Sequence, residues 1–175
     1  MSKVRTYINE NYRSFLLNAG LVAVVFFTAL AFQSRNMLST DGRGAPDLRG
    51  VTLAGEAYDL GNAANRPALV YFFAPWCKIC AASSGNLNRL RRWRDPEDIE
   101  IVAVALDYGS AAEVRAYAER HDLNVTVVLG DTNVSRQWQI RGFPSYYVLD
   151  EEHRIIRRDI GYSTQLGLWL RAWLI

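Results

Sequence analysis

From Asp47 onward, short apolar runs alternate with helical patterns, and this alternation constrains the fold more than any other feature of the chain. The run ALVYFF (68–73) is continuously apolar, as a strand covered on both faces would be. IEIVAVAL (99–106) and VTVVL (125–129) are two further strand candidates. Because strands that alternate with helices are typical of α/β proteins, we expect an α/β sandwich of three layers around one central mixed sheet.

The segments between these strands complete the pattern. Helices are expected over 77–93, from Ser110 onward, over 133–138 and over 164–174. Glu113 lies three residues after Ser110, which is the spacing of a capping box. Two antiparallel hairpins are expected, one within 51–60 and one that joins 145–150 to 154–160.

The N-terminal segment FLLNAGLVAVVFFTALAF (15–32) contains no charged residue. A helix of this length extends about 27 Å, close to the roughly 30 Å of bilayer hydrocarbon. We therefore expect one N-terminal transmembrane helix that precedes the α/β domain. The alternative is a signal peptide cleaved after Ala31, since Ala29-Leu30-Ala31 fits the small-x-small cleavage pattern. The apolar run is longer than the usual signal core, and this favours the anchor.

These observations divide the chain into four parts. We expect an N-terminal tail (1–14), a transmembrane anchor (15–32), a polar linker (33–46) and an α/β domain (47–175). The large domain and the short tail favour export of the domain across a membrane.

The charge of the chain gives no indication of a nucleic-acid partner. The formal net charge is only +2. The basic run 89–94 ends a predicted helix and is followed at once by Asp95, Glu97 and Asp98, as in a solvated helix end. We therefore expect no nucleic acid among the partners.

Both cysteines of the chain lie in the sequence PWCKIC (75–80). A disulfide between Cys77 and Cys80 would close too small a loop to stabilise the fold much. Such a bond would therefore have a chemical function rather than a structural one. The pair follows an apolar strand and opens a helix, whose N-terminal N–H groups favour a thiolate at Cys77. This position, with Lys78 beside it, is expected to lower the pKa of the thiol and activate it. A Cys-x-x-Cys pair at such a junction indicates a redox site.

A metal site is the other chemistry open to a cysteine pair. Zinc needs about four ligands, and the two histidines, His121 and His153, are distant in sequence from the cysteines. We therefore expect no zinc site. A two-coordinate Cu(I) site, for which thiolates suffice, stays open as an alternative.

A second motif, Gly142-Phe143-Pro144, precedes the predicted strand 145–150. Proline cannot donate a hydrogen bond to a sheet, so its place at the start of a strand needs a reason. Together, a strand followed by WCxxC and a helix, and a later Gly-x-Pro followed by a strand, resemble the thioredoxin superfamily. The anchor, the leading hairpin and the segment between the helix and the third strand resemble its TlpA/ResA-like branch, whose members are anchored bacterial thiol–disulfide oxidoreductases that face the periplasm. The resemblance covers residues 47–175 and implies a thioredoxin-like fold.

The resemblance also implies a role for each matching residue. Cys77 would be the exposed attacking thiol, and Cys80 would resolve the mixed disulfide. Pro144 would be a cis-proline opposite the cysteines, Phe143 would offer its backbone to an extended substrate segment, and Trp76 would shield the disulfide.

Three positions depart from the family pattern. Tyr71 stands where thioredoxins bury an aspartate, and Ser83 stands where many TlpA/ResA-like proteins have a glutamate. Gly85 replaces a proline that relatives often have in the helix. Cys80 therefore lacks an obvious acid, and Tyr71, Ser83, a water molecule or Asp107 are candidates to replace it.

The sequence thus predicts a thiol–disulfide oxidoreductase, anchored in the bacterial inner membrane by a single span, with its catalytic domain in the periplasm. It would exchange disulfides with exported proteins, with reduction as the favoured direction. A membrane or periplasmic redox partner would recycle the dithiol, and no organic cofactor is needed. The alternative is a Cu(I)-binding or partner-docking module on the same fold.

Overall fold

The computed structural model describes residues 37–63, 65–163 and Gly167, and in the N-terminal segment residues 12, 14, 16–22, 24–25 and 28. The chain divides into two compact units, Met1–Asn36 and Met37–Ile175. In the first unit every described residue is helical. None of the helices in the described residues combines the length and apolar character needed to cross a membrane. The predicted anchor, 15–32, lies partly outside the described residues.

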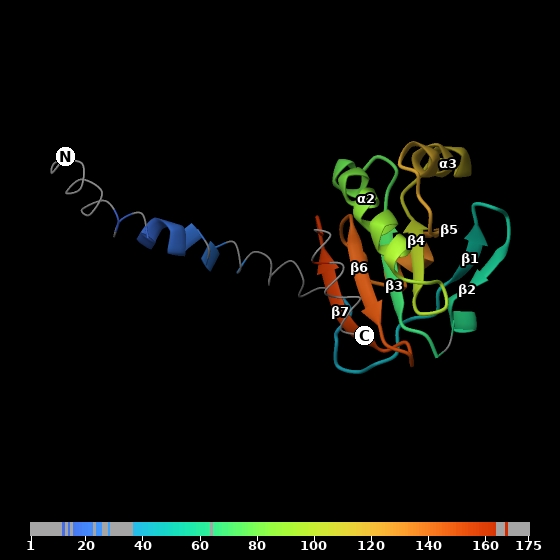
Figure 1. Ribbon diagram of the computed structural model, residues 1–175, viewed down its shortest axis with the longest axis horizontal. Helices are drawn as coiled ribbons and strands as arrows, with labels where there is room; N and C mark the ends of the chain where they lie inside the picture. Colours follow the sequence, from blue (N-terminus) through green and yellow to red (C-terminus); the bar gives the residue numbers. More distant parts are fainter. Residues whose placement is uncertain are drawn as a thin grey trace. The chain divides into compact units, whose positions relative to one another are not determined.

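In the described part of the second unit, seven strands form one sheet in the order β2-β1-β5-β4-β3-β6-β7 (Figure 1). β3, β4 and β5 pair in parallel, and every other neighbouring pair is antiparallel. The prediction of a mixed sheet is therefore confirmed, as are both hairpins, β1–β2 and β6–β7. The strands are β1 (Arg49–Thr52), β2 (Ala57–Asp59), β3 (Ala68–Phe73), β4 (Glu100–Ala105), β5 (Thr126–Leu129), β6 (Ser145–Leu149) and β7 (Ile155–Ile160).

The helices that cover this sheet arise where the sequence predicted them. They are α2 (Lys78–Trp93), α3 (Ala111–Arg120) and α4 (Thr132–Gln137). A short 3-10 helix, η1 (Leu60–Ala63), was not predicted. Ser110 caps α3 by accepting the backbone N–H of Glu113, as predicted. The Glu113 carboxylate accepts the N–H of Gly109 rather than that of Ser110, so the capping box is displaced by one residue.

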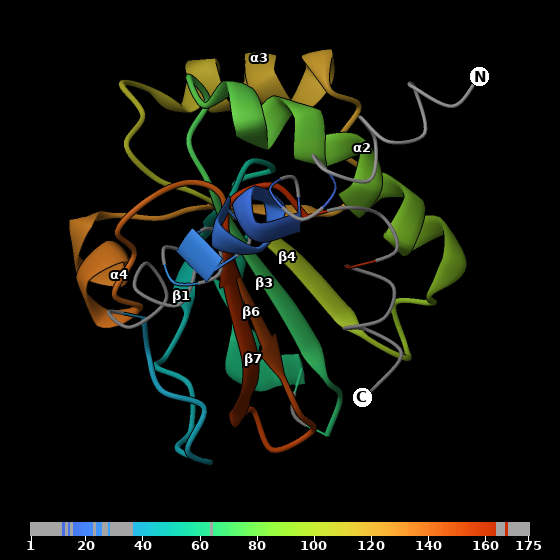
Figure 2. The same ribbon diagram turned by 90° about the vertical axis from the view of Figure 1, so that its left-hand side faces the viewer.

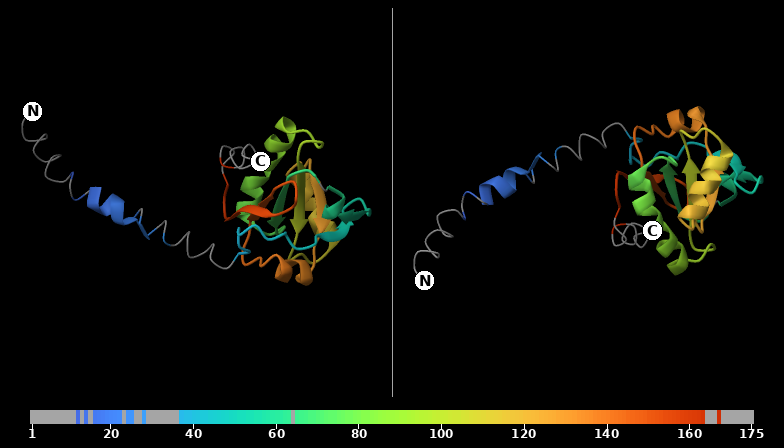
Figure 3. Two further views of the ribbon diagram at one scale, coloured as in Figure 1. Left: turned by 90° about the horizontal axis from the view of Figure 1, so that it is seen from below. Right: turned by 90° about the horizontal axis from the view of Figure 1, so that it is seen from above.

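Alternate residues of β3 point to opposite faces of the sheet, because side chains alternate along a strand. Leu69, Tyr71 and Phe73 enter the core beneath α2 and α3. Val70 and Phe72 enter the second core, beneath α4 and η1. The helices α2 and α3 thus cover one face, and α4 lies on the other (Figures 2 and 3). This three-layer arrangement explains why the β3 sequence is apolar throughout.

The basic run 89–94 lies at the C-terminal end of α2. The Arg91 guanidinium donates hydrogen bonds to the backbone carbonyls of Arg94, Asp95 and Ile99. These carbonyls belong to the helix end and the turn after it, where cationic side chains are favoured. Arg91 therefore has a structural role.

Part of the predicted linker lies on the domain. The compact unit begins at Met37, whose side chain is buried. The Ala45 N–H donates to the carbonyl of His153, and Gly44 forms an isolated β-bridge with Arg154, the residue before β7. The predicted helix over 164–174 lies outside the described residues, apart from Gly167, which is helical.

Candidate active site

The two cysteines form a disulfide at the N-terminus of α2. Their Cα atoms are 5.2 Å apart, a separation that disulfides commonly span. Cys77 is the N-cap residue, and its Sγ accepts the backbone N–H of Cys80 at 3.1 Å. The predicted placement of the Cys77 sulfur at a helix N-terminus is therefore confirmed. A donor already points at this sulfur and would stabilise a negative charge on it.

The two sulfurs differ in their access to solvent. Cys77 retains 6% of its surface, whereas Cys80 has none. The order matches the expectation that Cys77 is the more accessible cysteine, but in the disulfide form Cys77 is nearly buried rather than exposed. The reason is that both cysteines belong to the core beneath α2.

The peptide bond between Phe143 and Pro144 is cis, as the resemblance implied. Because β6 runs antiparallel to β3, its first residue, Ser145, pairs with Phe72 near the end of β3. The segment before β6 therefore lies at the same edge of the sheet as the residues that follow β3, which include Cys77. The Phe143 ring meets the Trp76 ring edge-on, with centroids 5.8 Å apart.

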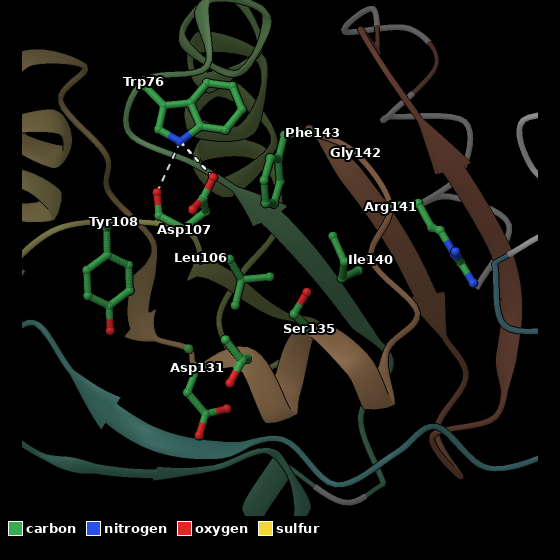
Figure 4. A pocket seen from close by; sticks show the side chains of 12 residues that line it. Trp76, Leu106, Asp107, Tyr108, Asp131, Ser135, Ile140, Arg141, Gly142 and Phe143 are labelled. Carbon is green, nitrogen blue, oxygen red and sulfur yellow. Dashed lines mark hydrogen bonds between the residues drawn. The ribbon is translucent and has the colours of Figure 1, made fainter.

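Trp76 is 60% exposed, yet its indole is held in place (Figure 4). The Nε1–H group donates to Asp107 twice, to the backbone oxygen at 3.0 Å and to Oδ2 at 3.1 Å. Asp107 follows β4, which is parallel to β3, so both residues extend from the same edge of the sheet. The carboxylate of Asp107 thus holds the tryptophan, and no hydrogen bond links it to Cys80.

A group of buried hydroxyls lies behind Cys80. The Tyr71 hydroxyl donates to the Cys80 carbonyl at 3.2 Å, and Ser84 Oγ donates to the same oxygen at 2.9 Å. Ser84 Oγ also shares a 3.0 Å hydrogen bond with the Tyr117 hydroxyl. Ser83, the other candidate, donates to the carbonyl of Ile79 instead. Of the side chains that the sequence named as replacements for the missing acid, Tyr71 is the one that hydrogen-bonds to Cys80. Ser84, which the sequence analysis did not name, hydrogen-bonds to the same carbonyl oxygen.

These tyrosines are donors and acceptors rather than bases. Burial, together with the nearby Tyr146 and Tyr117, raises the pKa of Tyr71 well above its ordinary value. Burial likewise raises the pKa of Tyr117. Both hydroxyls therefore stay neutral near pH 7, and among the described residues no carboxylate hydrogen-bonds to Cys80.

A groove of about 770 Å³ extends from Trp76 and Phe143 along the ends of β4 and β5 toward α4 (Figure 4). Leu106, Ser135 and Ile140 line its middle, Tyr108 and Asp131 lie on one side, and Arg141 lies on the other. The sequence analysis did not identify this groove, because its walls come from loops far apart in the chain. The signal that was available is the rule that loops at the carboxyl ends of parallel strands converge.

Gly130 is required at the groove by the close approach of β5 and β4. A Cβ atom there would lie 2.7 Å from Leu106 and 2.8 Å from Val104. Both distances are shorter than side-chain carbons tolerate, so only glycine lets the chain turn toward Asp131 at this point.

Two further predictions from the sequence concern Lys78 and metal binding. Lys78 is exposed on the first turn of α2, and its influence on the thiol pKa stays a prediction. Within the described residues, no group of three or more His, Cys, Asp or Glu side chains converges on a common point.

Comparison with known proteins agrees with this geometry. The family model described as Redoxin matches residues 40–166. The chain belongs to the Redoxin family. It is 25% identical over 161 residues to the thioredoxin-like protein YneN of Bacillus subtilis, an alignment that covers 86% of this chain and 94% of that protein. The predictions of a TlpA/ResA-like member of the thioredoxin superfamily and of a thiol–disulfide oxidoreductase are thereby confirmed.

Solved structures support the fold of this Redoxin-family chain. A thiol:disulfide interchange protein of Chlorobium tepidum superposes with a TM-score of 0.70 at 17% identity, covering 78% of this chain and 98% of that one. A secreted disulfide oxidoreductase of Mycobacterium tuberculosis, homologous to E. coli DsbE, superposes with a TM-score of 0.66 at 17% identity, covering 73% and 96%. The thioredoxin-like α/β fold is therefore confirmed.

Proposed function

We propose that Cys77 and Cys80 are the reactive pair of a membrane-anchored oxidoreductase that reduces disulfides in exported proteins. The Cys77 thiolate attacks one sulfur of a substrate disulfide, which forms a mixed disulfide and releases the other sulfur as a thiol. Cys80 then attacks Cys77, so that the substrate leaves fully reduced and the Cys77–Cys80 disulfide remains. A membrane or periplasmic partner returns two electrons and two protons to the pair.

One observation carries this proposal: the disulfide caps α2 beside a cis proline. The N–H of Cys80 points at Cys77 Sγ, which favours Cys77 as the attacking and leaving sulfur. The cis bond between Phe143 and Pro144 lies at the same sheet edge. We infer that the backbone of Phe143 pairs with an extended substrate segment, as an added strand would.

Exposed apolar side chains around the disulfide favour a protein as the substrate. Trp76, which precedes Cys77, is 60% exposed, and Ile79, which lies between the two cysteines, is 50% exposed. Exposed apolar groups that gather at one place commonly mark a protein-binding surface. We infer that Trp76 and Phe143 contact the substrate, and that the positive charge of Lys78 favours the thiolate of Cys77.

The export and anchoring of the domain rest on the uncharged segment 15–32. The description of the related mycobacterial protein as secreted also supports an extracytoplasmic domain. We therefore propose a single-pass protein of the bacterial inner membrane whose domain faces the periplasm.

The test is a trapping experiment with the full chain. Cys80→Ser removes the resolving thiol, so mixed disulfides between Cys77 and its substrates should accumulate in cells and run as adducts on a non-reducing gel. The matched control, Cys77→Ser, keeps one thiol but should trap far fewer partners, because Cys80 has no exposed surface. Equal trapping by both variants, or by neither, would contradict the assigned roles.

The direction of transfer is measured by the reduction potential of the pair. We expect a value near or below the roughly −270 mV of thioredoxin, since a reductant must hold its electrons weakly. A value near the roughly −120 mV of DsbA would make the protein an oxidant. If the pair forms no disulfide, the redox function is wrong and Cu(I) binding becomes the better explanation of the two thiols.

A further inference from the structure

The groove beside the disulfide continues into a second hollow that carries two arginines. This hollow, of about 340 Å³, is lined by residues of α4 and the turn after it: Thr132, Ser135, Arg136, Gln139, Ile140 and Arg141. Four of these residues also line the groove that begins at Trp76 and Phe143. The two hollows therefore form one continuous depression, with the aromatic pair at one end and the two arginines at the other.

The two arginines are available to a ligand. Arg136 lies in the last turn of α4, and Arg141 lies three residues before the cis proline. Both side chains are exposed. Within the described part of the chain, neither guanidinium takes part in a hydrogen bond or an ion pair. This separates them from Arg91, Arg49 and Arg154, whose guanidinium groups bind neighbouring carbonyls or carboxylates.

The acidic side chains of the groove are already engaged. Asp131 Oδ1 accepts the backbone N–H groups of Asn133 and Val134, which caps α4. Asp107 Oδ2 accepts the indole N–H of Trp76. Both carboxylates keep their negative charge, but neither aspartate lines the second hollow, where the charged side chains are Arg136 and Arg141, so that end of the depression is positive.

We propose that this depression binds an extended segment of the substrate protein, and that Arg136 and Arg141 select an acidic side chain on that segment. The inference rests on the proposed function, because it places the substrate cysteine at Cys77. From there the segment would pass Trp76 and Phe143, cover Leu106 and Ile140 with an apolar side chain, and bring a carboxylate to the arginines. A guanidinium suits this task because its planar fork matches a carboxylate.

The test is a competition between two peptides for Cys77 in the full chain carrying Cys80→Ser. Each peptide contains one cysteine and is supplied as its symmetrical disulfide. One carries glutamate at a chosen distance from the cysteine, the other carries glutamine there, and the distance is varied on both sides. The Cys77 thiolate attacks a peptide disulfide, one S–S bond breaks as another forms, and the departing peptide thiolate takes a proton from water. Intact-protein mass spectrometry then gives the ratio of the two adducts.

We expect an adduct ratio of about fivefold in favour of glutamate at one favoured distance, the size expected of two exposed ion pairs. Adding Arg136→Gln and Arg141→Gln should bring the ratio close to one. The matched control is Arg157→Gln, which removes an exposed arginine of β7 that lines neither hollow and should keep the ratio. About 1 M salt should reduce the preference, because exposed charges are screened.

The possible outcomes distinguish a failure of this inference from a failure of the proposed oxidoreductase function. A ratio near one at every distance, or a ratio that survives both arginine substitutions, overturns the inference while the oxidoreductase function stands. If neither peptide forms an adduct with Cys77, the proposed function fails and the inference fails with it.

Discussion

Replacing Ser84 with alanine should lower the free energy of unfolding of the oxidised domain, because the small hydroxyl of Ser84 makes two buried hydrogen bonds. Ser84 is only 1% exposed, and its Oγ bonds both the Cys80 carbonyl and the Tyr117 hydroxyl. After the substitution the Cys80 carbonyl keeps the donor Tyr71, and the Tyr117 hydroxyl, only 2% exposed, keeps Tyr71 as a neighbour but loses its serine partner. Each of the two hydrogen bonds that are lost with the Ser84 hydroxyl contributes about 0.5–1.5 kcal/mol. Alanine returns about 0.5 kcal/mol through its better helix propensity, so we expect a net loss of about 1–2 kcal/mol.

A double-mutant cycle with Tyr117→Phe tests this reasoning. Each single variant loses the Ser84–Tyr117 hydrogen bond, which the double variant loses only once, so the double variant should be more stable than the sum of the two single losses predicts. The assay is urea unfolding of the oxidised full chain, followed by tryptophan fluorescence, which the buried Trp138 reports. If the two single losses in the free energy of unfolding add to within about 0.5 kcal/mol, the hydroxyls are not coupled and the reasoning is refuted.

Three other predictions follow from individual contacts. Asp107→Ala leaves the Trp76 indole only the backbone acceptor and should weaken trapping of protein substrates several-fold, whereas Asp107→Asn keeps a side-chain acceptor and tolerates the positive φ of 50°; equal trapping by the two variants would argue against a role for the side-chain contact. Burial opposes ionisation of Asp150, but hydrogen bonds from Arg154 and its charge outweigh it and lower the pKa of that carboxyl. A lowered pKa stabilises the fold above about pH 4 and ceases to do so as the pH falls through the folded-state pKa. In urea unfolding at a series of pH values, wild type should therefore exceed Asp150→Asn in stability at pH 7 and lose that advantage in acid; a constant difference would contradict this. The Asn88 side chain joins α2 to the loop after α3 through three hydrogen bonds to the backbone of that loop. Asn88→Ala should therefore lower the free energy of unfolding by about 2–3 kcal/mol in the same assay. A loss below about 0.5 kcal/mol would contradict that role.

Local sequence was enough to predict most of the secondary structure. The strand at 68–73 and the helix after Cys77 were predictable because apolar periodicity and helix-start signals act over a few residues. The displaced cap of α3 and the packing of Met37 were not, since both depend on how neighbouring segments approach one another. The polar composition of 33–46 suggested a linker, yet its buried Met37 and the bridge at Gly44 are long-range contacts that composition does not reveal.

The candidate site divides in the same way. The sequence by itself determined the redox chemistry, because the cysteine spacing, the helix start and the proline before a strand are each properties of a short stretch of chain. Its resemblance to the thioredoxin superfamily also placed Tyr71 where that family buries an aspartate. Only the tertiary structure decided that Ser84 and Tyr117 complete the hydroxyl group behind Cys80, that Asp107 holds Trp76, and that a groove leads to Arg136 and Arg141. Trp76, Asp107 and the groove come together because parallel β3, β4 and β5 end at one edge of the sheet, whereas Ser84 and Tyr117 meet because α2 and α3 pack on the same face of it.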